Sequence, residues 1–225
     1  MVVFLVLTGY KLFRGTYPGQ GAKVNARRGG CLLKILPARK KNGIKAMDSE
    51  QERTKSLLLL FTGNGKGKTT SALGLAFRAM GHGFPVCMIQ FIKGSWHYGE
   101  LEAAKHFPSL FEIHVMGRGF TWQSEDLDKD IAAAREAWAF AEKTIRQGNC
   151  RLLILDELTY LFTYGMLDEH AVLAALASRP DTMHIVVTGR AASPGLIAAA
   201  DLVTEMVDIK HPYASGVMAQ QGIEF

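Results

Sequence analysis

Residues 57–75 read LLLLFTGNGKGKTTSALGL, an apolar run followed by a glycine-rich turn and then a segment typical of a helix. The apolar run has the length of a fully buried strand. The glycines of the turn allow backbone conformations that side chains forbid, so backbone N–H groups can converge on an anion. A helix that begins directly after the turn points its positive end at the same place. The stretch therefore predicts a phosphate-binding loop.

The loop departs from the usual spacing, which has four residues between a first glycine and the Gly-Lys pair. Thr62 stands where that first glycine would be, and the spacing from Gly63 to Gly67 is one residue short. We expect this shorter loop to hold phosphates differently. Lys68 can reach phosphate oxygens, and the Thr69 hydroxyl can bind magnesium. A chance Gly-Lys-Thr is disfavoured by the strand before it, the helix after it and a downstream strand that ends in Asp-Glu.

Charge is distributed unevenly along the 225 residues, which have a net charge of +5. Residues 1–46 contain ten of the 26 Lys and Arg and none of the 21 Asp and Glu, so residues 47–225 carry a net −5. A basic surface that binds nucleic acid could therefore be formed only by residues 1–46. We interpret 1–46 as a disordered basic tail or as sequence upstream of the true initiator, Met47, and 47–225 as one folded domain.

The sequence contains neither a membrane span nor a cysteine pattern typical of a metal site. No apolar run approaches the roughly 18 residues needed to span a membrane. Cys31, Cys87 and Cys150 are far apart and form no metal-ligand pattern, which indicates reduced thiols in a cytoplasmic protein.

Apolar segments alternate between strand and helix character from residue 57 onward. We expect strands at 57–62, 86–91, 111–116, 151–155, 184–188 and 202–207, and helices at 68–81, 100–106, 124–146, 168–178 and 193–199. On the first helix we expect one buried face, formed by Leu73, Ala76, Phe77 and Met80. Ser124 is expected to cap the third helix. The alternation predicts an α/β fold, a mostly parallel sheet with helices on both faces.

Two carboxylates follow the four aliphatic residues at 152–155. Ligands of parallel sheets bind at the carboxyl ends of the strands, where the phosphate-binding loop also lies. One of Asp156 and Glu157 can bind magnesium, directly or through water, and the other can orient it. With Thr69, these are the metal-ligand candidates.

Two cationic residues follow other strands. Lys93 can meet a phosphate or a ligand carboxylate, and a solvated loop lysine is the alternative. Arg190 can reach phosphates with its planar fork, and a surface ion pair is the alternative. The residues that we expect to bind the nucleotide are Gly63, Asn64, Gly65, Lys66, Gly67, Lys68, Thr69, Thr70 and Arg190.

Two large aromatic residues, Phe120 and Trp122, lie in a glycine-flanked loop after the third strand of this series. From the sequence alone they either tuck the loop onto the core or cover a flat apolar ligand. His211 lies in a similar loop near residue 225, without metal spacing around it, and we expect a local hydrogen-bonding role.

Together these motifs resemble those of the ATP:corrinoid adenosyltransferases of the CobA/BtuR/CobO type. The matching stretches are TGNGKGKTT (62–70), RAMGHG (78–83), QFIKGSW (90–96), GFTW (119–122), LDELTY (155–160), TGR (188–190) and GVMAQQGIEF (216–225). The resemblance covers about residues 50–225. A mild departure is Ser95, where the family often has threonine.

The resemblance implies transfer of the 5′-deoxyadenosyl group of ATP to the Co(I) of a corrinoid, cobalamin or cobyrinic acid a,c-diamide, with release of tripolyphosphate. It implies a RecA-like, P-loop NTPase-like fold with a six-stranded parallel sheet. Lys68 would act on the leaving group, with Mg²⁺ on Thr69 and Glu157 and with Asp156 in support. Phe120 and Trp122 would exclude the lower axial ligand of cobalt. No Ser-His-Asp or Cys-His set is present, and none is required.

The resemblance also implies partners. It suggests a cytoplasmic homodimer supplied with electrons by a flavin-type reductase, without membrane or nucleic-acid binding. Two other classes remain open: a P-loop ATPase or kinase, which would release phosphate or ADP, and a non-catalytic nucleic-acid binder that uses residues 1–46.

Overall fold

The computed structural model describes residues 7–8, 11–12, 55–93, 98–117, 119 and 127–225. The chain divides into two units, Met1–Glu50 and Gln51–Phe225, which are described separately. In the first unit, strands β1 (Leu7–Thr8) and β2 (Lys11–Leu12) form an antiparallel pair. The second unit contains the predicted phosphate-binding loop and all the elements described below.

One parallel sheet of six strands forms the centre of the second unit, in the order β5-β4-β6-β7-β3-β8. Its strands are β3 (Leu58–Thr62), β4 (Val86–Gln90), β5 (Phe111–Val115), β6 (Leu152–Asp156), β7 (His184–Thr188) and β8 (Leu202–Glu205). The helices are α1 (Lys68–Met80), α2 (Gly99–Ala104), α3 (Leu127–Gln147), α4 (Thr159–Thr163), α5 (Glu169–Ala177), α6 (Pro194–Ala199) and the 3-10 turn η2 (Pro212–Ser215).

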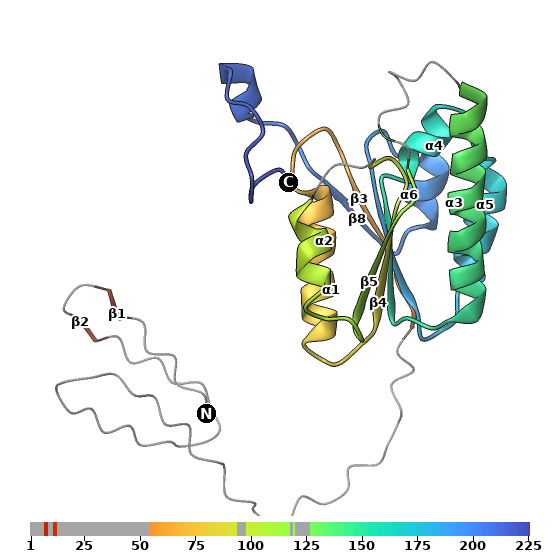
Figure 1. Ribbon diagram of the computed structural model, residues 1–225, viewed down its shortest axis with the longest axis horizontal. Helices are drawn as coiled ribbons and strands as arrows, with labels where there is room; N and C mark the ends of the chain where they lie inside the picture. Colours follow the sequence, from red (N-terminus) through yellow and green to blue (C-terminus); the bar gives the residue numbers. More distant parts are fainter. Residues whose placement is uncertain (1–6, 9–10, 13–54, 94–97, 118, 120–126) are drawn as a thin grey trace, which may run out of the picture. The chain divides into compact units, whose positions relative to one another are not determined.

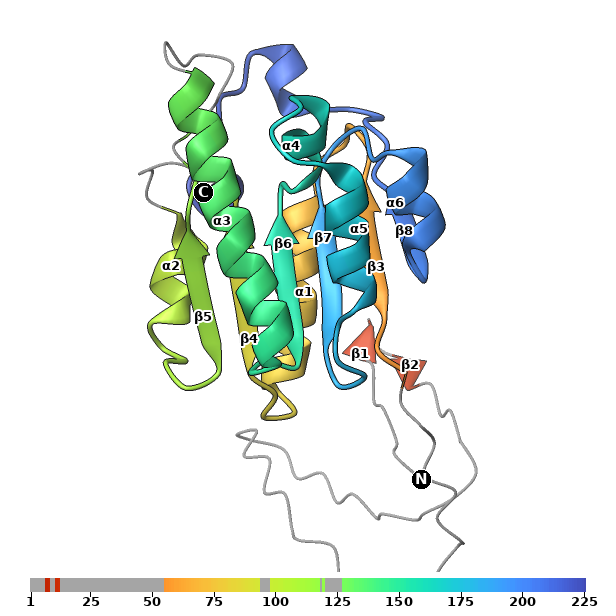
Figure 2. The same ribbon diagram turned by 90° about the vertical axis from the view of Figure 1, so that its right-hand side faces the viewer.

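Helices cover both faces of the sheet. Helices α1 and α2 lie on one face, and α3, α5 and α6 lie on the other (Figure 1, Figure 2). Each face has its own apolar core: Ala72, Ala76 and Ala104 pack on the first, and α3, α5 and α6 pack on the second. The central strands are apolar runs because they are buried on both sides. The predicted α/β architecture with a parallel six-stranded sheet is confirmed.

The predicted buried face of the first helix is wrong at Phe77, whose side chain is 70% exposed. Ala72 and Ala76 are the residues of α1 that pack fully on the sheet, while Leu73 and Met80 are partly buried. Phe77 lies one turn from Leu73 but faces a cavity between α1 and α2, which leaves its ring open to solvent. The periodicity predicted the correct side of the helix but made the buried face too wide.

Several boundaries differ from the prediction. Strand β6 extends one residue further and includes Asp156, and β8 ends at Glu205. The short helix α4 was not predicted, because its five residues, TYLFT, are β-branched or aromatic for the most part and have weak helix propensity. The predicted cap Ser124 lies outside the described residues. None of the helices in the described part of the chain is long and apolar enough to cross a membrane.

Candidate active site

The phosphate loop, residues 63–70, follows β3 at the carboxyl end of the sheet and includes the first turn of α1. Gly63 and Gly67 have φ values of 94° and 121°, which favour glycine. The N–H of Gly65 donates to the carbonyl of Met206 at 2.7 Å, and a Cβ on Gly65 would lie 2.6 Å from the Val207 carbonyl oxygen. The loop is therefore packed backbone to backbone against the chain that leaves β8, and this contact requires glycine.

Lys68 is the buried cation of the phosphate loop, with 7% of its surface exposed. Its ammonium donates to the carbonyl oxygens of Gly63 at 2.8 Å and Gly65 at 2.7 Å, so it closes the loop from inside. Burial lowers the pKa of Lys68 below its ordinary value, with Glu157 acting in the opposite direction. A positive charge thus lies where the loop and the start of α1 converge.

Asp156, the last residue of β6, is completely buried and is bound by two hydroxyl groups. Its Oδ1 accepts from Thr69 Oγ1 at 2.8 Å and from Thr188 Oγ1 at 2.7 Å. Its Oδ2 is buried without a hydrogen-bond partner. Because Thr69 donates its proton to Asp156, the lone pairs of the Thr69 hydroxyl are directed elsewhere and can bind a cation.

Glu157 occupies an unfavourable backbone conformation with a φ of 65°. Its N–H donates to Thr188 Oγ1 at 3.0 Å, and its Oε2 is buried without a partner. Burial, and then the neighbouring charge of Asp156, raise the pKa of Glu157 to about 7. A cation that arrives beside Glu157 favours its ionised form and lowers this pKa.

The oxygens of Thr69, Asp156 and Glu157 fit a magnesium ion. They are hard ligands, and two carboxylate oxygens of the pair are buried and unpartnered. No group of three or more His, Cys, Asp or Glu with metal-site geometry occurs within residues 55–93, 98–117 and 127–225. Magnesium sites often have only a few protein ligands, because substrate phosphates and water complete the coordination of the ion.

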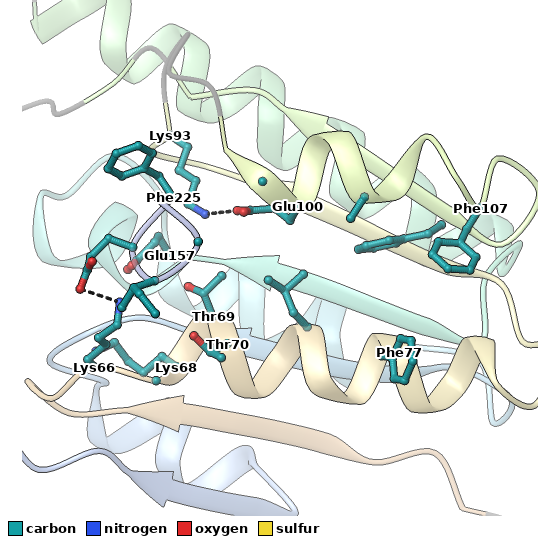
Figure 3. A pocket seen from close by; sticks show the side chains of 18 of the residues that line it. Lys66, Lys68, Thr69, Thr70, Phe77, Lys93, Glu100, Phe107, Glu157 and Phe225 are labelled. Carbon is teal, nitrogen blue, oxygen red and sulfur yellow. Dashed lines mark hydrogen bonds and ion pairs between the residues drawn. The ribbon is translucent and has the colours of Figure 1, made fainter. Parts of the chain in front are cut away.

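Lys93 lies beside the carboxylate pair and forms an ion pair with Glu100, a residue for which the sequence indicated no role in the site. Its Nζ is 2.5 Å from Glu100 Oε1 (Figure 3). The same atom is 3.7 Å from Asp156 Oδ2 and lies above the ring of Tyr98. Burial would lower the pKa of Lys93, but Asp156 and Glu100 outweigh it and raise the pKa above its ordinary value. Sequence reasoning placed Glu100 in a helix without a site role, because its contact with Lys93 depends on where α2 packs.

Arg190 follows β7 and has an exposed side chain close enough to influence the pKa of both Lys68 and Glu157. Its carbonyl accepts a hydrogen bond from Thr159 Oγ1 at 2.6 Å. The preceding Gly189 has a φ of 148°, and any Cβ there would overlap the Thr159 side chain. Helix α4 and this loop therefore pack tightly and fix the backbone at Arg190, whose charge acts on Lys68 and Glu157.

A cavity of about 520 Å³ is lined by several of these groups, although not by Asp156 or Arg190. The phosphate loop, Lys93, Glu100 and Glu157 surround one part, and apolar residues such as Phe77 of α1 and Phe107, which follows α2, line the rest (Figure 3). Residues 222–225 also line it, and Lys66 pairs with Glu224 at 3.4 Å. Apart from the family motif at 216–225, nothing in the sequence predicted that these residues line the cavity.

Some of the remaining candidates lie outside the described residues, and the others have a local or structural role. Phe120 and Trp122 lie outside the described residues, as does Cys31. His211 accepts a hydrogen bond from the N–H of Tyr213 at 3.2 Å, the local role that we expected. Cys87 and Cys150 are buried free thiols, and burial raises their pKa values to about 12 and about 11, which disfavours the thiolate form.

The fold and site define a P-loop nucleotide-binding protein of the α/β class. The solved structure of the flagellar accessory protein FlaH from Methanocaldococcus jannaschii has a similar fold, with a TM-score of 0.50 over 68% of this chain and 71% of that chain, at 9% identity. At this identity the likeness concerns the fold alone.

The sequence comparisons identify the family. Residues 54–225 match the family described as ATP:corrinoid adenosyltransferase BtuR/CobO/CobP, and the chain belongs to it. Corrinoid adenosyltransferases from Pseudomonas aeruginosa and Escherichia coli are 44% and 39% identical to it; each alignment covers 83% of this chain and 92% or 94% of the relative. The corrinoid adenosyltransferase CobA of Salmonella typhimurium is 37% identical over 82% of this chain and 93% of its own length.

Proposed function

We propose that this chain transfers the 5′-deoxyadenosyl group of ATP to the Co(I) centre of a corrinoid and releases tripolyphosphate. The observation that carries the proposal is the buried Lys68 inside a shortened phosphate loop, beside the Asp156–Glu157 pair. Family membership supplies the corrinoid as the second substrate.

The reaction needs a stabilised leaving group more than it needs a protein nucleophile. The electron pair of Co(I) forms the cobalt–carbon bond at the ribose 5′ carbon, and the bond from that carbon to the phosphate oxygen breaks. The tripolyphosphate takes the bonding electrons, and cobalt is formally oxidised to Co(III). Catalysis therefore depends on positioning and on cations near the departing oxygens.

The cations that we assign to this task are Lys68 and Arg190. Lys68 exchanges its two carbonyl contacts for phosphate oxygens when ATP enters the loop. Mg²⁺ bound by Thr69 and Glu157, with Asp156 in support, would supply additional positive charge to the triphosphate. Lys93 is placed to meet a phosphate or another anionic group of a substrate at the opposite wall.

For the corrinoid we propose that Phe120 and Trp122 pack below the ring and exclude the lower axial ligand. Without that donor, the cobalt orbital that accepts an electron is lower in energy, so Co(II) is easier to reduce. The reduction requires an electron donor, for which we propose a flavin-type reductase. A homodimer and a cytoplasmic location are further proposals, and both rest on the family resemblance.

The test is incubation of the full chain with ATP, Mg²⁺ and chemically reduced cobalamin, followed optically for the cobalt–carbon product. Lys68→Ala should lower the rate at least about 100-fold, the loss typical of removing one group that stabilises transition-state charge. Lys105→Ala is the control, because that lysine is exposed and pairs only with Glu102 among the contacts found for its ammonium. Product formation by Lys68→Ala at the rate of Lys105→Ala would contradict the assigned role.

A further inference from the structure

One hydroxyl group connects the two acidic residues of the site. Thr188, the last residue of β7, has no exposed surface. Its Oγ1 donates to Asp156 Oδ1 at 2.7 Å and accepts from the N–H of Glu157 at 3.0 Å. The Thr188 hydroxyl therefore uses its single proton to bind Asp156 and one of its lone pairs to bind Glu157, the two metal-ligand candidates.

The position of this residue follows from the sheet register. In the parallel pair β6·β7, Leu155 is opposite Val187, so the next residues, Asp156 and Thr188, meet at the carboxyl end of the two strands. A β-branched residue suits a central buried strand. A valine here would fill the same space and make neither hydrogen bond, so shape alone does not account for threonine.

The contact controls which way the Asp156 carboxylate faces. With Thr69 and Thr188 both on Oδ1, the other oxygen has no hydrogen-bond partner and makes only a long ion pair with Lys93 Nζ, at 3.7 Å. Without the Thr188 donor, Asp156 retains one hydroxyl contact and is free to turn toward the Lys93 ammonium. A closer ion pair would then compete with a cation for the same oxygen.

The second contact supports Glu157. Its φ of 65° is unfavourable for a residue with a Cβ, so the surrounding structure must hold it in place. The Thr188 oxygen is the acceptor found for the Glu157 N–H. Loss of this acceptor would leave a donor unpaired and allow the Glu157 carboxylate to move.

We propose that Thr188 is a positioning residue that orients the Asp156 and Glu157 carboxylates for the magnesium ion of the bound nucleotide. The inference rests on the proposed function, because it takes these carboxylates as ligands of Mg²⁺ that arrives with ATP. Groups that orient metal ligands in this way typically contribute 10–100-fold to metal affinity.

The experiment measures binding of Mn²⁺ with ATP to the full chain, without corrinoid, by equilibrium dialysis, because Mn²⁺ chelated by free ATP is then equal on both sides of the membrane. Thr188→Val should weaken Mn²⁺ binding about 10–100-fold. Thr188→Ser, which retains the hydroxyl, should stay within about threefold of wild type. Thr144→Val is the matched control, because it removes a side-chain hydrogen bond on α3 and should leave Mn²⁺ binding unchanged.

The outcomes separate positioning from packing. Wild-type Mn²⁺ affinity in Thr188→Val, even with a lowered Tm, would overturn the proposal, as would equal losses in the Ser and Val variants. If Thr188→Val does not fold, Thr188→Cys, which offers only a weak donor, is expected to show the same loss of Mn²⁺ binding, and wild-type affinity there would overturn the proposal. Hydroxyl-dependent Mn²⁺–ATP binding in a protein that forms no adenosylcorrinoid would support this inference and contradict the proposed function.

Discussion

Glu157 shows the conflict between stability and function at the scale of one residue. Its carboxylate is buried next to that of Asp156, and its backbone has an unfavourable φ. Each of these features destabilises the folded chain in the absence of ligand. Both are consistent with a site that is completed by a cation and a triphosphate.

The first prediction concerns the pH dependence of stability without metal or nucleotide. The folded-state pKa of Glu157 is raised from 4.5 to about 7, so between these values the folded state binds the proton more tightly than the unfolded state. This contribution to stability is present below about pH 4.5, decreases as pH rises to about 7, and is absent above it. Glu157→Gln should therefore be more stable than wild type at pH 8, by roughly 2–3 kcal/mol.

Urea unfolding at pH 5 and pH 8 in the presence of EDTA measures this difference. Glu142→Gln on the exposed side of α3 is the control and should follow the wild-type pH profile. Stability differences between Glu157→Gln and wild type that are equal at the two pH values would refute the assigned cause.

At the scale of elements, the phosphate loop and the chain after β8 form one packed unit. A methyl group on Gly65 would meet the Val207 carbonyl, whereas one on Gly74, in the exposed part of α1, meets nothing within 4 Å. Gly65→Ala should lower ATP affinity at least about tenfold by moving the loop, since such a close contact costs more than about 1 kcal/mol. Gly74→Ala should preserve ATP affinity and stabilise the fold by about 0.5–1 kcal/mol.

Isothermal titration with ATP and thermal unfolding of both variants check this pair. A Gly65→Ala variant that binds ATP like wild type would show that the loop does not depend on residues 206–207. Loss of ATP binding in both variants would mean that α1, and not the loop contact, is sensitive to added volume.

Helices and strands could be predicted where the burial of each residue produces a regular pattern of apolar residues. The strands of the sheet are aliphatic runs because both faces are covered, and Asp156 and Glu157 stood out as charges after such a run. Helix α4 could not be predicted, since it is short and is held by packing against Gly189. Phe77 was misplaced because the cavity beside it depends on the separation of two helices.

At the scale of the whole molecule, the parallel topology brings the ends of β3, β4, β6 and β7 to one edge. This explains why Lys68, Lys93 and the acidic pair could be predicted to lie together. The specific partners could not be predicted. Glu100 reaches Lys93 through the docking of α2, and Thr188 reaches Asp156 through strand register.

The uneven charge of the chain gives a further whole-molecule prediction. Residues 47–225 contain the entire site and carry a net −5, so a chain that begins at Met47 should retain corrinoid adenosylation within about twofold of the full chain. Any salt-sensitive binding of the full chain to DNA or RNA should disappear with residues 1–46. Adenosylation assays and nucleic-acid binding at two salt concentrations test both statements, and loss of adenosylation in a folded 47–225 chain would refute the first.

In the proposed reaction the chain uses ATP as a carbon electrophile with a triphosphate leaving group. The most direct measurement is the phosphorus-31 spectrum of the products after turnover with ATP, Mg²⁺ and reduced cobalamin. Tripolyphosphate in equal amount to the adenosylated corrinoid is the predicted result. ADP with inorganic phosphate, or ADP with a phosphorylated product, would contradict the account, because attack would then have occurred at phosphorus.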